Sequence, residues 1–163
     1  MRKLVCIIAI CAGFVACEKD VVYNTYQSVD LKQWNKDSIL SFTFNPIDTI
    51  SKNNVYVNLR NNSDYKYSNL FLIVGIEFPD HYTVIDTLEY EMADATGKFL
   101  GSGRTELKEN KLEYKTNVVF PHTGDYIFTV QHAMRKAGDP EGIPVLKGIS
   151  DVGISIEKIG DNE

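Results

Sequence analysis

The residues that could do chemistry in this chain are few and scattered. Its three histidines, His81, His122 and His132, lie far from its cysteines, whereas a zinc site needs Cys, His or carboxylate ligands at close spacings. We therefore expect no metal site, and we expect hydrogen-bonded or solvent-exposed roles for the histidines. The sequence also lacks a nucleophile elbow, a phosphate-binding loop and a dinucleotide fingerprint.

The acidic residues give no better catalytic candidate. Glycoside hydrolysis needs two carboxylates that converge across one bond. Glu89 and Glu91 stand two positions apart in an alternating segment, so they share its solvated face. Asp37, Asp48 and Asp86 are isolated in the same way. We predict a protein that is not an enzyme, with no catalytic residue, no cofactor and no small-molecule substrate, and calcium held by loop carboxylates stays open as an alternative.

The first sixteen residues have the pattern of an export signal. Arg2 and Lys3 provide a positive start, an apolar or small-residue run covers 4–15, and the small residue Ala16 precedes a cleavage position. The run is shorter than the roughly 20 residues that a bilayer-spanning helix requires. We predict that residues 1–16 are a signal peptide that is removed.

Cys17 is the first residue after the predicted signal, and its chemistry decides how the mature chain begins. The stretch Phe14-Val15-Ala16-Cys17 resembles a lipobox, the site at which a bacterial cysteine is acylated before cleavage. Cys6 and Cys11 leave with the signal, and a single cysteine in an exported chain has no internal disulfide partner. We predict that Cys17 is the lipid attachment site, with palmitate among its acyl chains; ordinary cleavage that leaves a free thiol is the alternative.

Charge and length narrow the class of protein further. The formal net charge is −5, and removing a signal that carries Arg2 and Lys3 makes the mature chain more acidic. Nucleic-acid binding needs clustered Lys and Arg, so that function is excluded, as is adhesion to anionic lipid. Membrane association should therefore depend on the acyl chains alone. The remaining residues suffice for one domain.

Apolar residues alternate with polar ones along most of the mature chain, which is typical of half-buried strands. Leu40, Phe42 and Phe44 share one face of a predicted strand. The segment 69–78 is apolar on both faces and predicts a central strand covered on both sides. Further strands are predicted at 55–59, 83–92, 112–120, 126–130 and 152–156. The chain is predicted to be all-β, a single antiparallel β-sandwich, immunoglobulin-like or jelly-roll-like, with about eight or nine strands.

The predicted organisation has three parts. Residues 1–16 form the signal peptide, 17–27 the lipidated N-terminus and its tether, and 28–163 the sandwich, with a small helix allowed near 31–35. Pro121-x-x-Gly124-x-Tyr126 leads into a strand as a tyrosine corner does, although a plain turn would use the same residues.

Aromatic residues near loops are the candidates for binding. Trp34 is the only tryptophan, and rim aromatics of a β-sandwich can stack on sugars or anchor a protein partner. The tyrosines concerned are Tyr23, Tyr26, Tyr65, Tyr67 and Tyr82. Core packing is the alternative for each of them.

Several segments in order along the chain carry a family resemblance. Met134-Arg135 and the run Leu146-x-Gly148-Ile149-x-Asp151-Val152-Gly153-Ile154 come after "YKYSNL", "GKFLGSG" and "FPHTGDYIF". The combination resembles the GldH family of gliding-motility lipoproteins from Bacteroidota, over nearly all of the mature chain. Phe99 and Ser155 depart from that family, which usually has Trp and commonly has Arg there.

The resemblance implies a non-enzymatic envelope lipoprotein that supports the assembly or stability of the gliding-motility and type IX secretion machinery. Its partners would be other envelope proteins of that machinery, and its location the periplasmic face of the outer membrane, with the cell surface as the alternative. A different function, as a surface-exposed glycan-binding lipoprotein that uses rim aromatics, also fits the sequence.

The Gly/Pro-rich loop 138–145 is the expected partner contact. Arg135 and Asp151 flank this loop and could pair to set its shape, so these two residues and Trp34 are the candidate contact residues; two solvated charges are the alternative. Deleting 138–145 is expected to abolish partner binding and to leave the fold intact.

Overall fold

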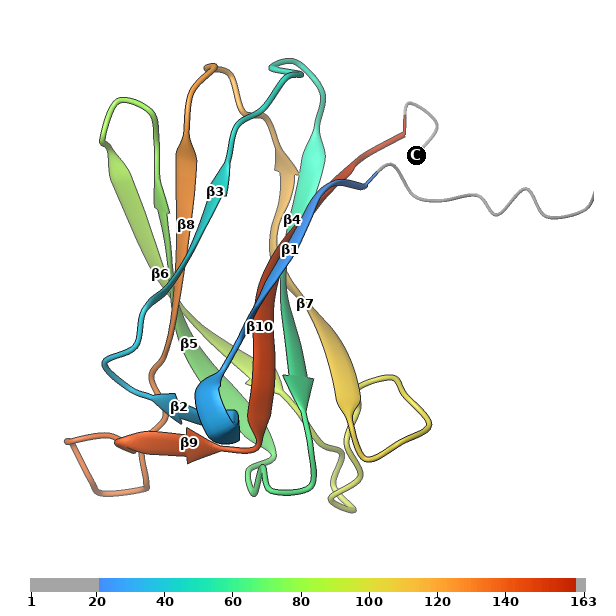
Figure 1. The fold of residues 1–163 in the computed structure, drawn as a ribbon, viewed down its shortest axis with the longest axis vertical. Helices are drawn as coiled ribbons and strands as arrows, with labels where there is room; N and C mark the ends of the chain where they lie inside the picture. The colour runs from blue at the N-terminus through green and yellow to red at the C-terminus, as the bar shows by residue number, and fades with distance from the viewer. Residues whose placement is uncertain (1–20, 161–163) are drawn as a thin grey trace, which may run out of the picture.

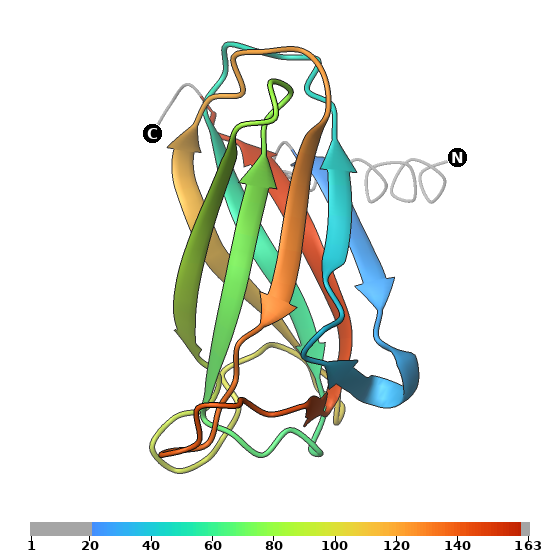
Figure 2. The same cartoon turned by 90° about the vertical axis from the view of Figure 1, so that its left-hand side faces the viewer.

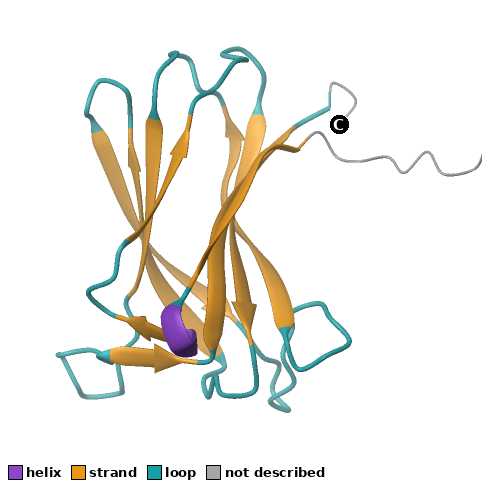
Figure 3. Cartoon of the chain, in the orientation of Figure 1, coloured by secondary structure: helices purple, strands orange, loops and turns teal. Residues whose placement is uncertain are grey.

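The computed structural model describes residues 21–160 as an almost entirely β structure (Figure 3). The strands are β1 (Val21–Ser28), β2 (Gln33–Asn35), β3 (Leu40–Phe44), β4 (Asn53–Asn61), β5 (Asn69–Glu77), β6 (Thr83–Glu91), β7 (Lys108–Val118), β8 (Tyr126–His132), β9 (Val145–Lys147) and β10 (Ile149–Lys158). The one helical element in this range is a 3-10 turn, η1 (Asp30–Lys32). No helix within 21–160 has the length and apolar character to span a bilayer.

Eight of the strands form two antiparallel sheets that face each other (Figures 1 and 2). The strand orders are β1-β10-β4-β7 and β3-β8-β5-β6. Apart from the β5–β6 hairpin, consecutive long strands lie in opposite sheets, and the first long strand pairs with the last. This order is that of a jelly roll. The predicted antiparallel sandwich is confirmed, and its strand order selects the jelly-roll alternative.

The alternation in the sequence explains which faces meet. Phe42 and Phe44 of β3 point into the core, whereas Ser41 is exposed. Val55 and Val57 of β4 are fully buried in the same core cluster. Full burial of such a side chain stabilises a fold by about 1.5–3 kcal/mol relative to exposure. The buried side chains of β3 and β4 therefore hold the two sheets together.

Strand β5 occupies the predicted central position, between β8 and β6. Leu70, Leu72 and Val74 are fully buried. Phe71 and Ile73 are only half-buried on the other face, so the prediction of cover on both sides is wrong. In a sandwich each sheet packs against one partner, and the outer face of β5 therefore remains partly open to solvent.

The tyrosine corner is present. The Tyr126 ring is fully buried, and its hydroxyl oxygen accepts a hydrogen bond from the backbone N–H of His122, at 3.3 Å. The ring packs edge-on against Phe78 and Phe120, with centroid distances of 5.4 and 5.0 Å. The contact fixes the turn that leads into β8.

The ordered sandwich begins earlier than the sequence indicated. β1 pairs with β10 along its whole length, and Tyr23 packs edge-on against Phe44 across the sandwich at 5.4 Å. Residues 21–27 therefore belong to the sheet and not to the tether. The predicted signal peptide and Cys17 lie outside the described residues.

Strand register defines two ends of the sandwich. Asn53, at the start of β4, faces both Lys158 of β10 and Val118 of β7, and Val21 faces Glu157. The start of β1, the β3–β4 loop and the β7–β8 loop therefore share one end, which we call the N-terminal end; it is uppermost in Figure 1. The opposite end carries η1 and the two-stranded β2–β9 ribbon, and we call it the ribbon end.

Candidate functional site

The outer face of the sheet β1-β10-β4-β7 carries a concentration of polar side chains, which we call the polar sheet face. Register aligns them in rows that cross all four strands. One row contains Tyr26, Gly153, Asn58 and Lys111, and the next contains Ser28, Asp151, Arg60 and Glu109. Residues from four distant segments of the chain thus lie side by side on one surface.

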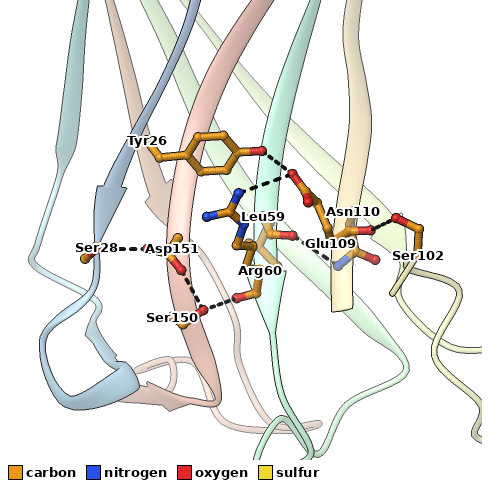
Figure 4. A network of polar contacts seen from close by, with 9 residues as sticks. All are labelled: Tyr26, Ser28, Leu59, Arg60, Ser102, Glu109, Asn110, Ser150 and Asp151. Atoms are coloured by element: carbon orange, nitrogen blue, oxygen red, sulfur yellow. Dashed lines mark hydrogen bonds and ion pairs between the residues drawn. The ribbon is translucent and has the colours of Figure 1, made fainter. Parts of the chain in front are cut away.

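Tyr26 crosses this face from one edge strand to the other (Figure 4). Its hydroxyl donates a hydrogen bond to Oε1 of Glu109, at 2.6 Å. The Arg60 guanidinium lies 4.3 Å from the centre of the tyrosine ring and 3.6 Å from the same carboxylate. A Cβ at Gly153 would stand 2.9 Å from two atoms of the Tyr26 ring, so the glycine provides the room for the ring to lie across the sheet.

Electrostatics make this cluster a structural clasp and not an acid–base pair. Burial, followed by the hydrogen bond to Glu109, raises the pKa of Tyr26 far above its usual value. The phenol therefore keeps its proton near neutral pH and acts as a donor. The Glu109 carboxylate accepts the hydrogen bond from the phenol and forms an ion pair with Arg60, so its negative charge is balanced within the cluster.

Asp151 has different partners from those predicted. Its carboxylate accepts hydrogen bonds from the hydroxyls of Ser28, at 2.9 Å, and Ser150, at 2.8 Å (Figure 4). Arg135 is exposed near the ribbon end, and no ion pair joins it to Asp151 within residues 21–160. The predicted Arg135–Asp151 pair is therefore wrong, because strand pairing places Asp151 on the sheet face.

A groove with a volume of about 520 Å³ adjoins the Tyr26 clasp. Its polar lining includes Asn24, Asn58, Glu91, Ser102, Lys111, Ser155 and Glu157. Ser155 and Asn58 are only 4% and 5% exposed, and the Ser155 hydroxyl has no hydrogen-bond partner in the described part of the chain. A small number of polar groups that converge in a recess usually fix the orientation of a bound ligand. The groove is therefore a candidate binding site.

A second recess lies at the ribbon end, and we call it the lysine pocket. Its volume is about 360 Å³, and it is formed by the loop before β9 and the β4–β5 connection. Its charged lining consists of Asp64, Lys66, Lys136, Asp139 and Lys147, and Tyr67 contributes an aromatic wall. Three lysines against two aspartates make this a locally positive site on an acidic protein.

The loop 138–145 is anchored to the fold more firmly than the sequence suggested. Ile143 is 7% exposed, and its backbone N–H donates to the Met134 carbonyl at 2.7 Å. Val145 pairs with Asn35 in the β2–β9 ribbon. The structure argues against the prediction that deletion of 138–145 leaves the fold intact, because the deletion would remove a core side chain and part of this ribbon.

Trp34 belongs to the core. It is 1% exposed, its indole N–H donates to the Ser38 carbonyl at 3.0 Å, and its ring lies edge-on to His132 at 5.4 Å. A buried ring presents no surface to a partner, so the core-packing alternative holds and the prediction of a partner contact at Trp34 is corrected.

Most of the five tyrosines predicted to lie at the rim are partly or fully buried. Tyr65 is 2% exposed and donates to the Asn69 carbonyl at 2.6 Å. Tyr23 packs against the core, and Tyr67 lines the lysine pocket. Of the five predicted rim tyrosines, Tyr82 is the most open, at 64% exposed. The predicted aromatic rim is therefore not a continuous surface.

The histidines have separate environments. The His81 ring lies 2.8 Å from Glu77, His122 is exposed, and His132 is 2% exposed with its Nε2 at 3.1 Å from the Trp34 carbonyl oxygen. Burial lowers the pKa of His132. Across residues 21–160 no three His, Cys, Asp or Glu side chains gather as a metal site.

A jelly-roll domain with a polar groove on one sheet is the class of protein that the described residues define. The chain belongs to the GldH lipoprotein family, whose sequence profile matches residues 21–156. This membership confirms the resemblance noted in the sequence.

Two curated relatives align over most of their length. A protein of Christiangramia forsetii named as a gliding motility lipoprotein GldH homolog is 48% identical over 89% of this chain and 88% of its own. The gliding motility lipoprotein GldH of Flavobacterium johnsoniae is 44% identical over 88% of both chains.

The similarity of this chain to solved structures is weaker. A chain of the infectious bursal disease virus VP2 subviral particle covers 84% of this chain with 18% identity and a TM-score of 0.36. A chain of the Gx strain of that virus covers 86% with 16% identity and a TM-score of 0.38. In each case this chain spans 30% of the viral chain.

Proposed function

We propose that this protein is a non-enzymatic envelope lipoprotein that supports the assembly or stability of the gliding-motility and type IX secretion machinery by binding other envelope proteins. The relatives named as gliding motility lipoproteins over 88% of their length support the motility role. The anchor is Cys17, acylated and held in the outer membrane on its periplasmic face, and the cell surface is the alternative location.

The lysine pocket is the observation that carries the partner-binding role. It lies at the ribbon end, and β1 runs from the N-terminal end toward that end (Figure 1). Lys66, Lys136 and Lys147 converge there on a chain whose net charge is −5. Complementary charge steers association and excludes like-charged partners. The partner is therefore an envelope protein with an acidic segment that enters this pocket beside Tyr67.

Site-specific crosslinking in cells tests this role. A photo-reactive residue in place of Lys136, in the full-length protein with a C-terminal tag, should capture gliding or type IX components from the outer-membrane fraction. The same residue in place of Glu89, exposed on β6, is the control for non-specific capture. Equal capture from both positions, or capture of polysaccharide-uptake proteins only, would reject the proposal.

The groove supports a second candidate function, the binding of a glycan. The unpartnered Ser155 hydroxyl lies among amides and carboxylates that suit a ligand rich in hydroxyl groups. This differs from the predicted use of rim aromatics, since the recess is on the sheet face. A glycan array probed with the purified protein should give hits that weaken in Ser155→Ala, and a silent array would reject this function.

A further inference from the structure

Two isoleucines project from the β3–β4 loop into solvent. Ile47 is 101% exposed and Ile50 is 86% exposed. Asp48 holds the loop between them, since its carboxylate accepts hydrogen bonds from the backbone N–H groups of Ile50 and Ser51 at 3.0 Å. Lys158 of β10 pairs with the same carboxylate at 2.9 Å. The loop is therefore fixed in a shape that presents both apolar side chains outward.

Other exposed apolar residues lie at the same end. Val21 and Val22, where β1 begins, are 47% and 46% exposed, and Val119 after β7 is 37% exposed. The register Asn53↔Val118 and Val21↔Glu157 places all of them at the N-terminal end of the sandwich, where Figure 2 draws the start of β1 and the β3–β4 loop. This end thus combines several apolar side chains that the described fold leaves uncovered.

The chain length between the anchor and the fold is short. From Cys17 to Val21 there are four residue steps, which span at most about 14 Å. Strands of nine or ten residues, such as β4 and β10, span about 30 Å. An acylated Cys17 must therefore hold the N-terminal end close to the lipid surface and leave the ribbon end well away from it.

We propose that the N-terminal end of the sandwich rests on the leaflet that holds the acylated Cys17, with Ile47 and Ile50 inserted into the headgroup region. This inference rests on the lipid anchor of the proposed function. Apolar side chains at the interface add binding through the apolar area that they bury. Of the carboxylates nearby, Asp48 is paired with Lys158, and Asp125 accepts a hydrogen bond from Asn45 and keeps its charge, which a zwitterionic surface does not repel.

The ribbon end offers a matched control. Leu31 in η1 is 88% exposed, so it is similar to Ile50 in size and exposure, but it lies at the opposite end of the strands (Figure 3). The orientation predicts that lipid covers positions 47 and 50 and leaves position 31 in water.

The test uses the mature, acylated protein in zwitterionic vesicles of phosphatidylethanolamine and phosphatidylcholine. Ile47→Cys, Ile50→Cys and Leu31→Cys each provide one free thiol for an environment-sensitive fluorophore, once intact mass has established that Cys17 is acylated. Lipids with a doxyl quencher should reduce the fluorescence at 47 and 50 several-fold more than at 31.

The outcomes separate the orientation from the anchor. Protein that co-floats with the vesicles but shows equal quenching at 47 and 31 overturns the orientation alone. Protein with an unmodified Cys17 that fails to co-float overturns the anchor, and the orientation with it. A label at 47 that is shielded from water but not quenched by doxyl lipid places a second copy of the chain on this end, and it also overturns the proposal.

Discussion

Tyr26 and Glu109 join the two edges of one sheet, since the phenol on β1 donates to the carboxylate on β7 at 2.6 Å across the intervening strands β10 and β4. The two residues are separated by 83 positions in the sequence. Arg60 covers the ring from β4. The clasp therefore holds together a sheet face that no other strand of residues 21–160 covers.

Removal of the Tyr26 hydroxyl should weaken the sheet. We expect Tyr26→Phe to lower the free energy of unfolding by about 1 kcal/mol, the usual net contribution of a hydrogen bond. Urea denaturation measures the change. Tyr56→Phe on the same face is the control, because no hydrogen bond is made by the Tyr56 hydroxyl within residues 21–160; equal losses in the two variants would contradict the role of the clasp.

Gly153 should be intolerant of a side chain. A Cβ there would lie 2.5 Å from the Thr25 carbonyl oxygen and 2.9 Å from the Tyr26 ring. We expect Gly153→Val to lower the free energy of unfolding by about 1–3 kcal/mol, as overpacking does. Gly160→Ala is the control, because a Cβ at that position meets no atom within 4 Å. A denaturation midpoint unchanged in Gly153→Val would show that both the ring and the β1 backbone at Thr25 shift at little cost.

The buried His132 should make stability depend on pH. Burial lowers its pKa in the folded state, whereas in the unfolded chain the pKa is about 6.5. The unfolded state therefore binds more protons as the pH falls below about 6.5, and the free energy of unfolding should decrease by up to about 1.4 kcal/mol per pH unit.

Denaturation at about pH 7.5 and pH 5.5 measures this dependence. His132→Gln should lose this part of the slope, whereas substitution of the exposed His122 should retain it. A wild-type slope that survives unchanged in His132→Gln would assign the pH dependence to other groups.

The charge of the lysine pocket should govern partner capture. We expect the double variant Lys66→Glu and Lys136→Glu to reduce the yield of crosslinked partner at least about tenfold, because like charges at an interface oppose association. Circular dichroism checks that the fold is kept. Lys98→Glu, in the exposed β6–β7 connection, reverses a lysine elsewhere and should change little; equal loss in that variant would point to net charge and not to the pocket.

Loss of Cys17 should release the protein from the membrane. In Cys17→Ala no acyl chain can be attached, and several chains are what give durable anchoring. We expect the variant to appear in the soluble fraction or to retain its signal, and intact mass distinguishes the two. Tight membrane association of a cleaved, unacylated variant would mean that the domain binds lipid or a membrane partner by itself.

The amino-acid sequence by itself determined the fold class and the family, and it left the tyrosine corner open against a plain turn. Alternation is a local property: it assigns Phe42, Val57 and Leu72 to buried faces without knowledge of which strands are neighbours. The family resemblance likewise depends on the order of residues along the chain and not on their contacts.

The tertiary structure alone decided the strand order, the start of the domain and the composition of the candidate sites. A period of two gives the face of a residue but not its neighbour across the sheet, so the sequence could not separate a jelly roll from an immunoglobulin-like sandwich. The Tyr26–Glu109 clasp, the serine partners of Asp151 and the burial of Trp34 all depend on strand pairing. Pairing brings together segments that are distant along the chain, and it is therefore decided only when the whole core packs.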